Sequence, residues 1–205
     1  GTEGQVEFTL STGDKITISN GASVKNVSDT AAKNNTYDYE LTNADQYETV
    51  TASYGTLTIT ARNVTLTSAD DTKEYDGSPL TNSTVTVSGD GFVSGEGATY
   101  NVTGSQTEVG GEAKNNTFTY TLNEGTLAEN YEINPVYGTL TVTKSTKAIT
   151  ISSDSKGWKY DGSDHSYEKY TVTYGDETIE GTEGQVEFTL STGDKITISN
   201  GASVK

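Results

Sequence analysis

The chain has 205 residues, of which 31% are hydrophobic, and carries 29 acidic against 13 basic side chains for a net charge of −16. This negative charge would repel the phosphate backbone of DNA or RNA, so nucleic acid is not an expected partner. No apolar run is long enough to cross a bilayer, so no membrane insertion of this segment is expected, and cysteine and methionine are both absent. The low aliphatic content would by itself favour disorder. Thirteen tyrosines in an alternating pattern indicate instead thin folded cores closed by tyrosine rings.

A long exact repeat sets the organisation of the chain. Residues 1–25 recur without a change at residues 181–205, and the offset from position 1 to position 181 sets a 180-residue period. Identity over this length points to recent duplication within one gene. We therefore expect the chain to be one full repeat plus an overlap, cut from a longer tandem-repeat protein. Neighbouring repeats of the same protein are then its expected partners.

Apolar residues alternate with threonine through most of the chain, which predicts strands with one buried face. Threonine is β-branched and tolerates water, so it suits the exposed side of a strand. In chain order, the predicted strands centre on residues 6–10, 16–18, 37–41, 57–59, 64–66, 85–87, 118–122, 140–142, 149–151 and 170–174. Turn signals rich in glycine separate these strands. Only one or two helical turns are expected, near residues 28–33 and 126–130.

A weaker repeat lies inside the 180-residue period. The segment Ala-Lys-Asn-Asn-Thr occurs at residues 32–36 and 113–117, each time before a strand. Tyr-Gly-Thr-Leu-Thr follows later in both copies, and a Tyr-Asp-Gly turn also occurs twice. These matches predict two alternating modules. Residues 62–146 would form a complete module B, residues 1–61 the C-terminal part of module A, and residues 147–205 the N-terminal part of the next module A.

The repeated Tyr-Asp-Gly turns and Tyr-Gly-Thr-Leu-Thr endings, the second preceded by Ala-Glu-Asn-Tyr-Glu-Ile at residues 128–133, resemble the YDG and MBG modules of bacterial surface adhesins. The resemblance covers nearly all of the chain, module by module. It implies an extracellular protein of the bacterial cell surface or cell wall, in which such modules act mainly as spacers. Some relatives are connected with adhesion to mucin or host surfaces.

The fold that we expect is all-β, with tandem Ig-like β-sandwich modules of roughly seven short strands. Short connections such as residues 60–63 and 144–147 would join the modules in an extended array. The alternative is a β-grasp-like module with one short helix. The predicted function is a structural stalk or filament repeat. The alternative is a repeat that binds mucin or other host or microbial surface glycans and gains strength from multivalency.

The two repeated motifs are interpreted as structural. Asp-Gly suits a tight turn because glycine tolerates positive φ and aspartate accepts hydrogen bonds from nearby amides. The tyrosine beside it would cover the core, although it could instead stack on a sugar next to a carboxylate. The residues concerned are Tyr75, Asp76, Gly77, Tyr160, Asp161 and Gly162 in the turns, and Tyr54, Gly55, Tyr137 and Gly138 in the closing segments.

Three groups of residues could in principle form chemical sites. His165 lies between Asp164 and Ser166, and these three residue types also form the catalytic triad of hydrolases. Adjacent side chains on an extended chain point in different directions, however, and a triad assembles from distant segments. We therefore expect a solvated loop histidine and no enzyme. Calcium could bind acidic turns, yet none matches a known calcium loop, so solvated turns and no cofactor are expected. A lysine–asparagine crosslink is a third possibility. The acidic candidates are Asp70, Asp71, Glu74, Asp76, Asp90 and Glu96, and the crosslink candidates are Lys73, Lys144, Lys147, Lys159, Asn130 and Asn134.

Overall fold

The computed structural model describes residues 4–199, and it is all-β, as the sequence predicts. Its only helical elements in this range are three turns of 3-10 helix, η1 (Val27–Asp29), η2 (Ala44–Gln46) and η3 (Ala128–Asn130). The first and third lie where helical turns are predicted. The strands are β1 (Glu7–Thr9), β2 (Lys15–Ser19), β3 (Asp38–Leu41), β4 (Arg62–Ser68), β5 (Asp71–Glu74), β6 (Val85–Gly89), β7 (Ala98–Val102), β8 (Phe118–Leu122), β9 (Tyr131–Val136), β10 (Leu140–Thr143), β11 (Ile149–Ser153), β12 (Tyr170–Tyr174), β13 (Glu177–Glu180), β14 (Glu187–Thr189) and β15 (Lys195–Thr197).

Contacts divide the chain into two compact units. Unit 1 comprises Gly1–Leu66, Val87–Thr99 and Tyr120–Pro135, and unit 2 comprises Thr67–Thr86, Tyr100–Thr119 and Val136–Lys205. Residues 62–146 contribute seven strands, β4 to β10, with sheet orders β6-β4-β9, β10-β5 and β7-β8. The limits of the units differ from the predicted module limits at residues 61 and 146, which stay predictions.

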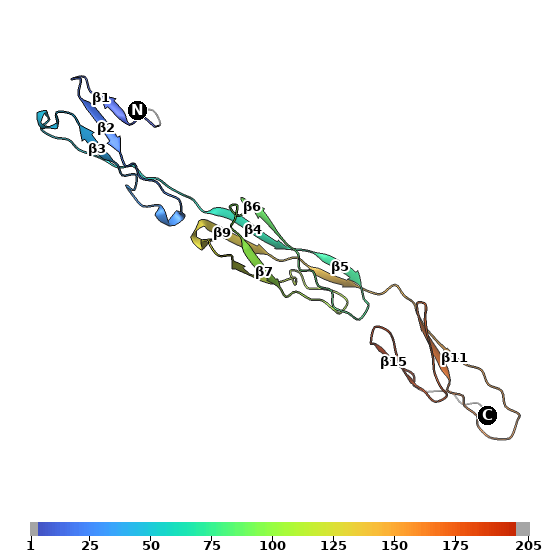
Figure 1. Ribbon diagram of the computed structural model, residues 1–205. Helices are drawn as coiled ribbons and strands as arrows, with labels where there is room; N and C mark the ends of the chain where they lie inside the picture. Colours follow the sequence, from blue (N-terminus) through green and yellow to red (C-terminus); the bar gives the residue numbers. More distant parts are fainter. Residues whose placement is uncertain (1–3, 200–205) are drawn as a thin grey trace. The chain divides into compact units, whose positions relative to one another are not determined.

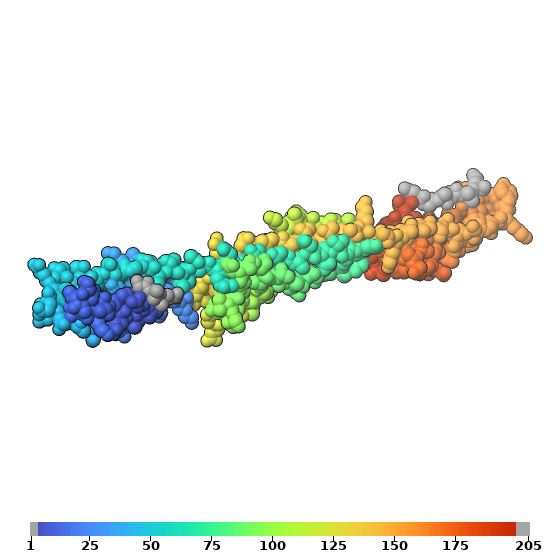
Figure 2. All heavy atoms as spheres, turned by 90° about the horizontal axis from the view of Figure 1, so that it is seen from above, coloured from blue at the N-terminus to red at the C-terminus, as the bar shows by residue number. Residues whose placement is uncertain are grey.

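In unit 1, strands β1, β2 and β3 form an antiparallel sheet (Figure 1). Directly paired residues point to the same side of such a sheet. Its apolar side, here called the Phe8 face, is therefore formed by Phe8, Ile16, Ile18, Tyr39 and Leu41. In Figure 2 the blue residues of β1 and β2 lie beside the cyan residues of the same unit. Every one of these five side chains remains at least partly exposed.

The buried residues of unit 1 lie elsewhere, around β4 and the start of β9. Val64 and Leu66 on β4 are buried. Tyr131 is also buried, and its ring packs on Phe92 with centroids 5.0 Å apart. The Tyr131 hydroxyl donates to Glu96 Oε2 at 2.6 Å, so the ring closes the core while its polar end is satisfied. Burial, followed by this carboxylate, raises the pKa of Tyr131.

Unit 2 contains two small cores. In the first, β5 pairs in parallel with β10, and Leu80, Leu140 and Val142 are buried with Tyr75 packed against them. In the second, the antiparallel sheet β11-β12-β13 lies over the hairpin β14-β15. The second core buries Val172, Tyr174, Phe188 and Leu190, and Tyr170, Ile179, Ile196 and Ile198 pack against them.

One predicted strand and one predicted buried face need correction. The closing segment around Leu57 and Ile59 is not a strand, although the matching residues 140–143 form β10. Strand β10 exists because it pairs with β5, and the counterpart segment of unit 1 has no such ladder partner among the described residues. Ile149 and Ile151 are on β11, as predicted, but are 52% and 50% exposed.

Candidate functional site

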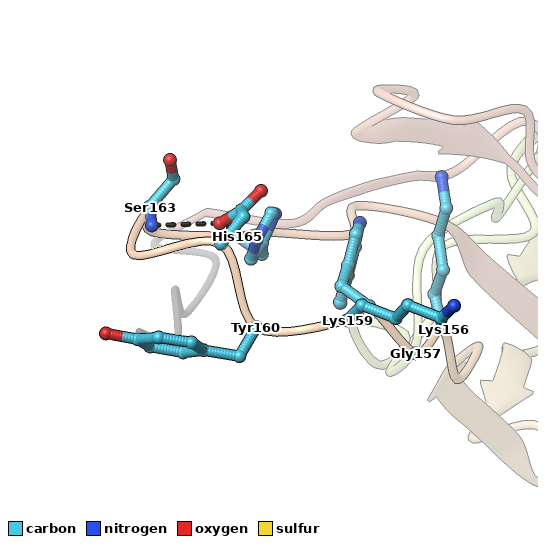
Figure 3. Close-up of a pocket in the computed structure, with 8 residues that line it drawn as sticks. Lys156, Gly157, Lys159, Tyr160, Ser163 and His165 are labelled. Atoms are coloured by element: carbon cyan, nitrogen blue, oxygen red, sulfur yellow. Dashed lines mark hydrogen bonds and ion pairs between the residues drawn. The ribbon is translucent and has the colours of Figure 1, made fainter.

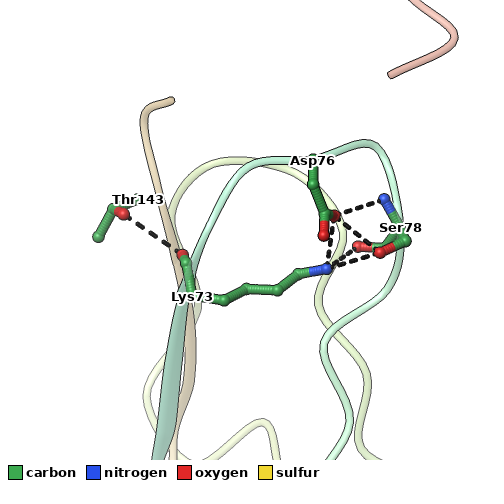
Figure 4. A network of polar contacts seen from close by, with 4 residues as sticks. All are labelled: Lys73, Asp76, Ser78 and Thr143. Atoms are coloured by element: carbon green, nitrogen blue, oxygen red, sulfur yellow. Dashed lines mark hydrogen bonds and ion pairs between the residues drawn. The ribbon is translucent and has the colours of Figure 1, made fainter. Parts of the chain in front are cut away.

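The first Tyr-Asp-Gly turn follows β5 and is held by a network centred on Asp76 (Figure 4). Lys73 Nζ lies 2.7 Å from Asp76 Oδ1 and also donates to both oxygens of Ser78. The amide and the hydroxyl of Ser78 donate to the same Asp76 oxygen, at 2.9 and 2.7 Å. Lys73, and then Ser78, hold the pKa of the Asp76 carboxyl well below its ordinary value. The network therefore fixes an ionised carboxylate at the turn.

Glycine is required at position 77 for two reasons. Gly77 has a φ of 81°, which residues with a Cβ rarely adopt. A Cβ at this position would also lie only 2.0 Å from the carbonyl oxygen of Thr192. The turn can therefore approach the backbone of the β14–β15 hairpin only because position 77 has no side chain.

Tyr75 has one side in the core of unit 2 and its polar end outside. Its ring packs against the cluster of Leu80, Leu140 and Val142. Its hydroxyl donates to Asp194 Oδ1 at 3.1 Å, and this bond raises the pKa of Tyr75. The tyrosine thus covers the core and also bonds to a segment far along the chain.

The second Tyr-Asp-Gly turn has the same backbone form in a different setting (Figure 3). Gly162 again has a φ of 81°, and the amide of Ser163 donates to Asp161 Oδ1 at 2.9 Å. His165 Nε2 lies 3.0 Å from that oxygen. The Ser163 amide and then His165 lower the pKa of Asp161. Tyr160 is 92% exposed and points away from the other labelled side chains (Figure 3), so it covers no core.

His165 lies in a loop, as predicted, but its ring is not free in solvent. It stacks on Trp158 with centroids 5.0 Å apart and an angle of 13° between the planes. Lys156 Nζ lies 5.8 Å from the Trp158 ring centroid and 4.7 Å from that of Tyr167. These side chains and their neighbours surround an open hollow of about 330 Å³, lined by residues 156–161 together with Ser163 and His165.

The closing segments are held by the Asn-Asn pair that precedes a strand in each copy. The side chain of Asn34 accepts from the Leu57 amide at 2.6 Å and donates to the Leu57 carbonyl at 2.9 Å. Asn115 makes the same two bonds to Leu140, at 2.7 and 3.0 Å. Each amide side chain thus takes the place of a strand neighbour. The sequence shows the repeated asparagines, but their role was missed because their bonding partners are distant in the chain.

The glycines of the closing segments differ in their surroundings. A Cβ on Gly138 would lie 2.4 Å from the Ala69 carbonyl oxygen, whereas a Cβ on Gly55 would meet only Asn35, at 3.8 Å or more. The preceding tyrosines have matching ring contacts. Tyr137 meets Phe118 and Tyr54 meets Tyr37, both edge to face with centroids 5.3 Å apart.

Hydrogen bonds also join residues that belong to successive predicted modules. In unit 1, Asn130 Oδ1 accepts from the Val27 amide at 2.9 Å and Asn130 Nδ2 donates to Asn26 Oδ1 at 3.0 Å. In unit 2, the Tyr75–Asp194 bond is accompanied by a bond of 2.8 Å between the hydroxyls of Ser145 and Tyr174. Sequence reasoning missed these contacts because nothing in the local pattern marks them.

The other candidates have partners within the chain. Asp70 accepts from the Thr139 amide, Asp71 from Asn82, Glu74 from Thr146 and Asp90 from the Asn63 amide. No group of three or more acidic or histidine side chains that could hold a metal ion occurs among residues 4–199.

Some of the crosslink candidates have noncovalent partners. Lys73 contacts Asp76 and Ser78, and Lys147 lies over the Tyr174 ring. Asn130 forms hydrogen bonds with Asn26 and Val27.

No family model, curated protein or solved structure matches this chain. Within the described part of the chain, no helix has the length and apolar character needed to span a membrane.

Proposed function

We propose that this chain is a structural repeat of an extracellular stalk or filament on a bacterial surface, with no catalytic role. The observation that carries the proposal is the set of side-chain bonds between successive predicted modules. Asn130 bonds to Asn26 and Val27 in unit 1, and Tyr75 bonds to Asp194 in unit 2. A spacer needs such bonds, because modules joined by chain alone would swivel freely.

Composition and repetition support the same proposal. Identical repeats in series add length without adding new chemistry. The net charge of −16 keeps neighbouring copies apart and soluble. The Tyr-Asp-Gly turn contributes through its tyrosine, which both covers a core and bonds to the next segment.

Small-angle X-ray scattering on the full chain tests the proposal. A compact domain of this length has a radius of gyration of about 17 Å. A stalk segment should give a clearly larger value and a distance distribution with a long tail. A radius of gyration equal to that of a compact domain would contradict the proposal. The double variant Tyr75→Phe/Asn130→Ala should broaden the distribution, whereas Tyr160→Phe, at an exposed tyrosine, should leave it unchanged.

A second candidate function is glycan binding at the hollow around Trp158. Tyr160 is 92% exposed beside Trp158 and Lys156, and exposed aromatic rings next to polar groups suit sugar rings. We rank it second because residues 156–159 match the β5 strand of the complete module. There the corresponding strand β5 is paired with β10, whereas residues 156–159 lie in no strand of the described part of the chain.

Binding of mucin and a glycan array to beads that carry many copies of the chain separates the two candidates. Glycan binding predicts retention that is lost in Tyr160→Ala and kept in Tyr120→Ala, a matched change at another exposed tyrosine. Beads that retain no glycan at high density would remove this candidate and leave the stalk proposal untouched.

A further inference from the structure

Strands β5 and β10 lie near the start and the end of segment 62–146, and they run parallel to each other. Asp71 lies opposite Leu140, and Glu74 lies opposite Thr143. The strands that come directly before them, β4 and β9, are also neighbours in a sheet. The first strands of this segment are therefore joined to its last strands, and every residue of the joint lies inside the described part of the chain.

The edge of β10 that faces β5 is held by backbone and side-chain hydrogen bonds. The Asp71 amide donates to the Thr139 carbonyl at 3.0 Å, and the Tyr75 amide donates to the Thr143 carbonyl at 2.9 Å. The hydroxyl of Thr143 also donates to the Lys73 carbonyl, at 3.3 Å (Figure 4). These bonds extend the parallel ladder at both of its ends.

The other edge of β10 is held as well. Val142 and Gly110 exchange two backbone bonds, of 2.7 and 2.8 Å. The side chain of Asn115 bonds to both the amide and the carbonyl of Leu140. Leu140 and Val142 are also buried in the core beneath the strand. Strand β10 therefore cannot slide without breaking bonds along two edges and exposing two apolar side chains to water.

The order of the strands in the chain determines how tension would act on this joint. Tension along the chain enters segment 62–146 through β4, which precedes β5, and leaves it after β10. Because β5 and β10 run in the same direction, this tension pulls them lengthwise in opposite senses. The bonds between them are then loaded together. Tension applied to two neighbouring strand ends would instead break such bonds one after another, at a lower force.

We propose that β10 is a mechanical clamp, which keeps segment 62–146 folded when the chain is stretched. The load is shared between β5 on one edge of the strand and Gly110 and Asn115 on the other. This inference rests on the proposed function, because a stalk under tension needs such a clamp. Forced unfolding is governed by the rate of unfolding, so the clamp contributes kinetic stability under load.

Single-molecule stretching of the full chain in two directions tests the clamp. The chain has no cysteine, so two introduced cysteines attach the handles at defined positions. Thr60→Cys/Lys144→Cys pulls β5 and β10 lengthwise, whereas Pro79→Cys/Lys144→Cys pulls both strands from their C-terminal ends. All three positions are exposed. The gain in length identifies the segment that unfolds, at about 3.6 Å per released residue.

The lengthwise pair should rupture at a force at least about twice that of the other pair at the same pulling speed, because the same bonds break together instead of in sequence. Equal forces, or a lower force for the lengthwise pair, would overturn the proposal. The result is distinguishable from that of the scattering experiment. A compact radius of gyration with a high lengthwise force contradicts the stalk and not the clamp, and an extended chain with equal forces contradicts only the clamp.

The second edge of β10 is tested by Asn115→Ala in the lengthwise pair. This change removes both side-chain bonds to Leu140, so the rupture force should fall. Asn34→Ala is the matched control, since it removes the same two bonds to Leu57, outside the anchored segment, and should leave the force unchanged. Equal effects of the two changes would contradict the shared load.

Amide hydrogen exchange at Val142 checks that the Asn115→Ala chain is folded. If it is not, Asn115→Asp takes its place, since the carboxylate retains an acceptor for the Leu140 amide and loses the donor to the Leu140 carbonyl. The rupture force of this variant should also fall below that of the Asn34→Ala control. A force equal to that of the control would contradict the proposal.

Discussion

The hairpins β1–β2 and β14–β15 form the same local structure in two environments. Phe8 pairs with Ile16 in one, and Phe188 pairs with Ile196 in the other. The same ion pair, Lys15–Glu7 in the first hairpin and Lys195–Glu187 in the second, has a length of 2.9 Å in both. The threonine hydroxyl of each turn donates to the following aspartate, at 2.8 and 2.7 Å. Local sequence is therefore sufficient to specify the hairpin, its register and its turn.

Burial separates the two hairpins. Phe188 is 1% exposed under β12, whereas Phe8 is only partly buried. The same contrast holds between Val64 and Leu66 of β4, which are buried, and Ile149 and Ile151 of β11, which are about half exposed. Alternation in the sequence thus says which side of a strand is apolar. Whether that side is covered depends on strands from elsewhere.

The largest expected effect tests this comparison with the same substitution at two sites. Phe188→Ala should lower the free energy of unfolding of unit 2 by about 3–5 kcal/mol, because it leaves a cavity under β12. Phe8→Ala should lower the stability of unit 1 by at most about 1.5 kcal/mol, because its ring already contacts water. Urea titration followed by amide exchange at β12 and β2 measures both.

Equal losses for the two variants would contradict the difference in burial. The measurement is made at low protein concentration, so that association between copies does not add to the stability of either hairpin. Val87→Ala, at an exposed valine on β6, is a control that should change stability by about 0.5 kcal/mol or less.

A smaller effect is expected at the second asparagine of each Asn-Asn pair. Asn116 is fully buried and donates to the Ala69 and Asn82 carbonyls, at 2.8 and 3.1 Å. Asn116→Ala would leave those carbonyls without this partner and should cost about 1–3 kcal/mol. Asn35 occupies the same motif position but is exposed, so Asn35→Ala should cost about 0.5 kcal/mol or less. Thermal unfolding of both variants gives the comparison, and a costly Asn35→Ala would speak against it.

The smallest expected effect is a loss of stability of the fold at low pH. Tyr47, then Asn43 and Thr12, donate to Asp14 and hold its pKa below the ordinary value. A carboxylate whose pKa is lower in the folded chain stabilises the fold above the unfolded pKa and loses this contribution as pH falls through the folded pKa. Protection of β2 amides should therefore decrease below about pH 4. Because Asp14 is only partly buried, the change is small, and Asp14→Asn should flatten it. An unchanged pH profile in that variant would exclude this role.

Sequence reasoning reached the candidate site unevenly. Both Tyr-Asp-Gly turns form with glycine at positive φ, as Asp-Gly favours. The tyrosines differ, since Tyr75 covers a core and Tyr160 does not. The bond from Tyr75 to Asp194 could not be predicted, because it joins distant segments whose meeting depends on packing. The sequence shows the repeated Asn-Asn pair, but it does not show that the first asparagine of each pair forms hydrogen bonds with Leu57 or Leu140.

The sequence by itself determined the all-β class, the 180-residue period, the hairpin register and the turn glycines. Each of these follows from neighbours in the chain, through alternation, β-branching and permitted backbone angles. Only the tertiary structure decided which apolar faces are covered, why Leu140 lies in a strand and Leu57 does not, and which tyrosine meets Asp194. Those outcomes depend on partners far along the chain. Two hairpins of identical sequence contain no local information about which of them will be buried.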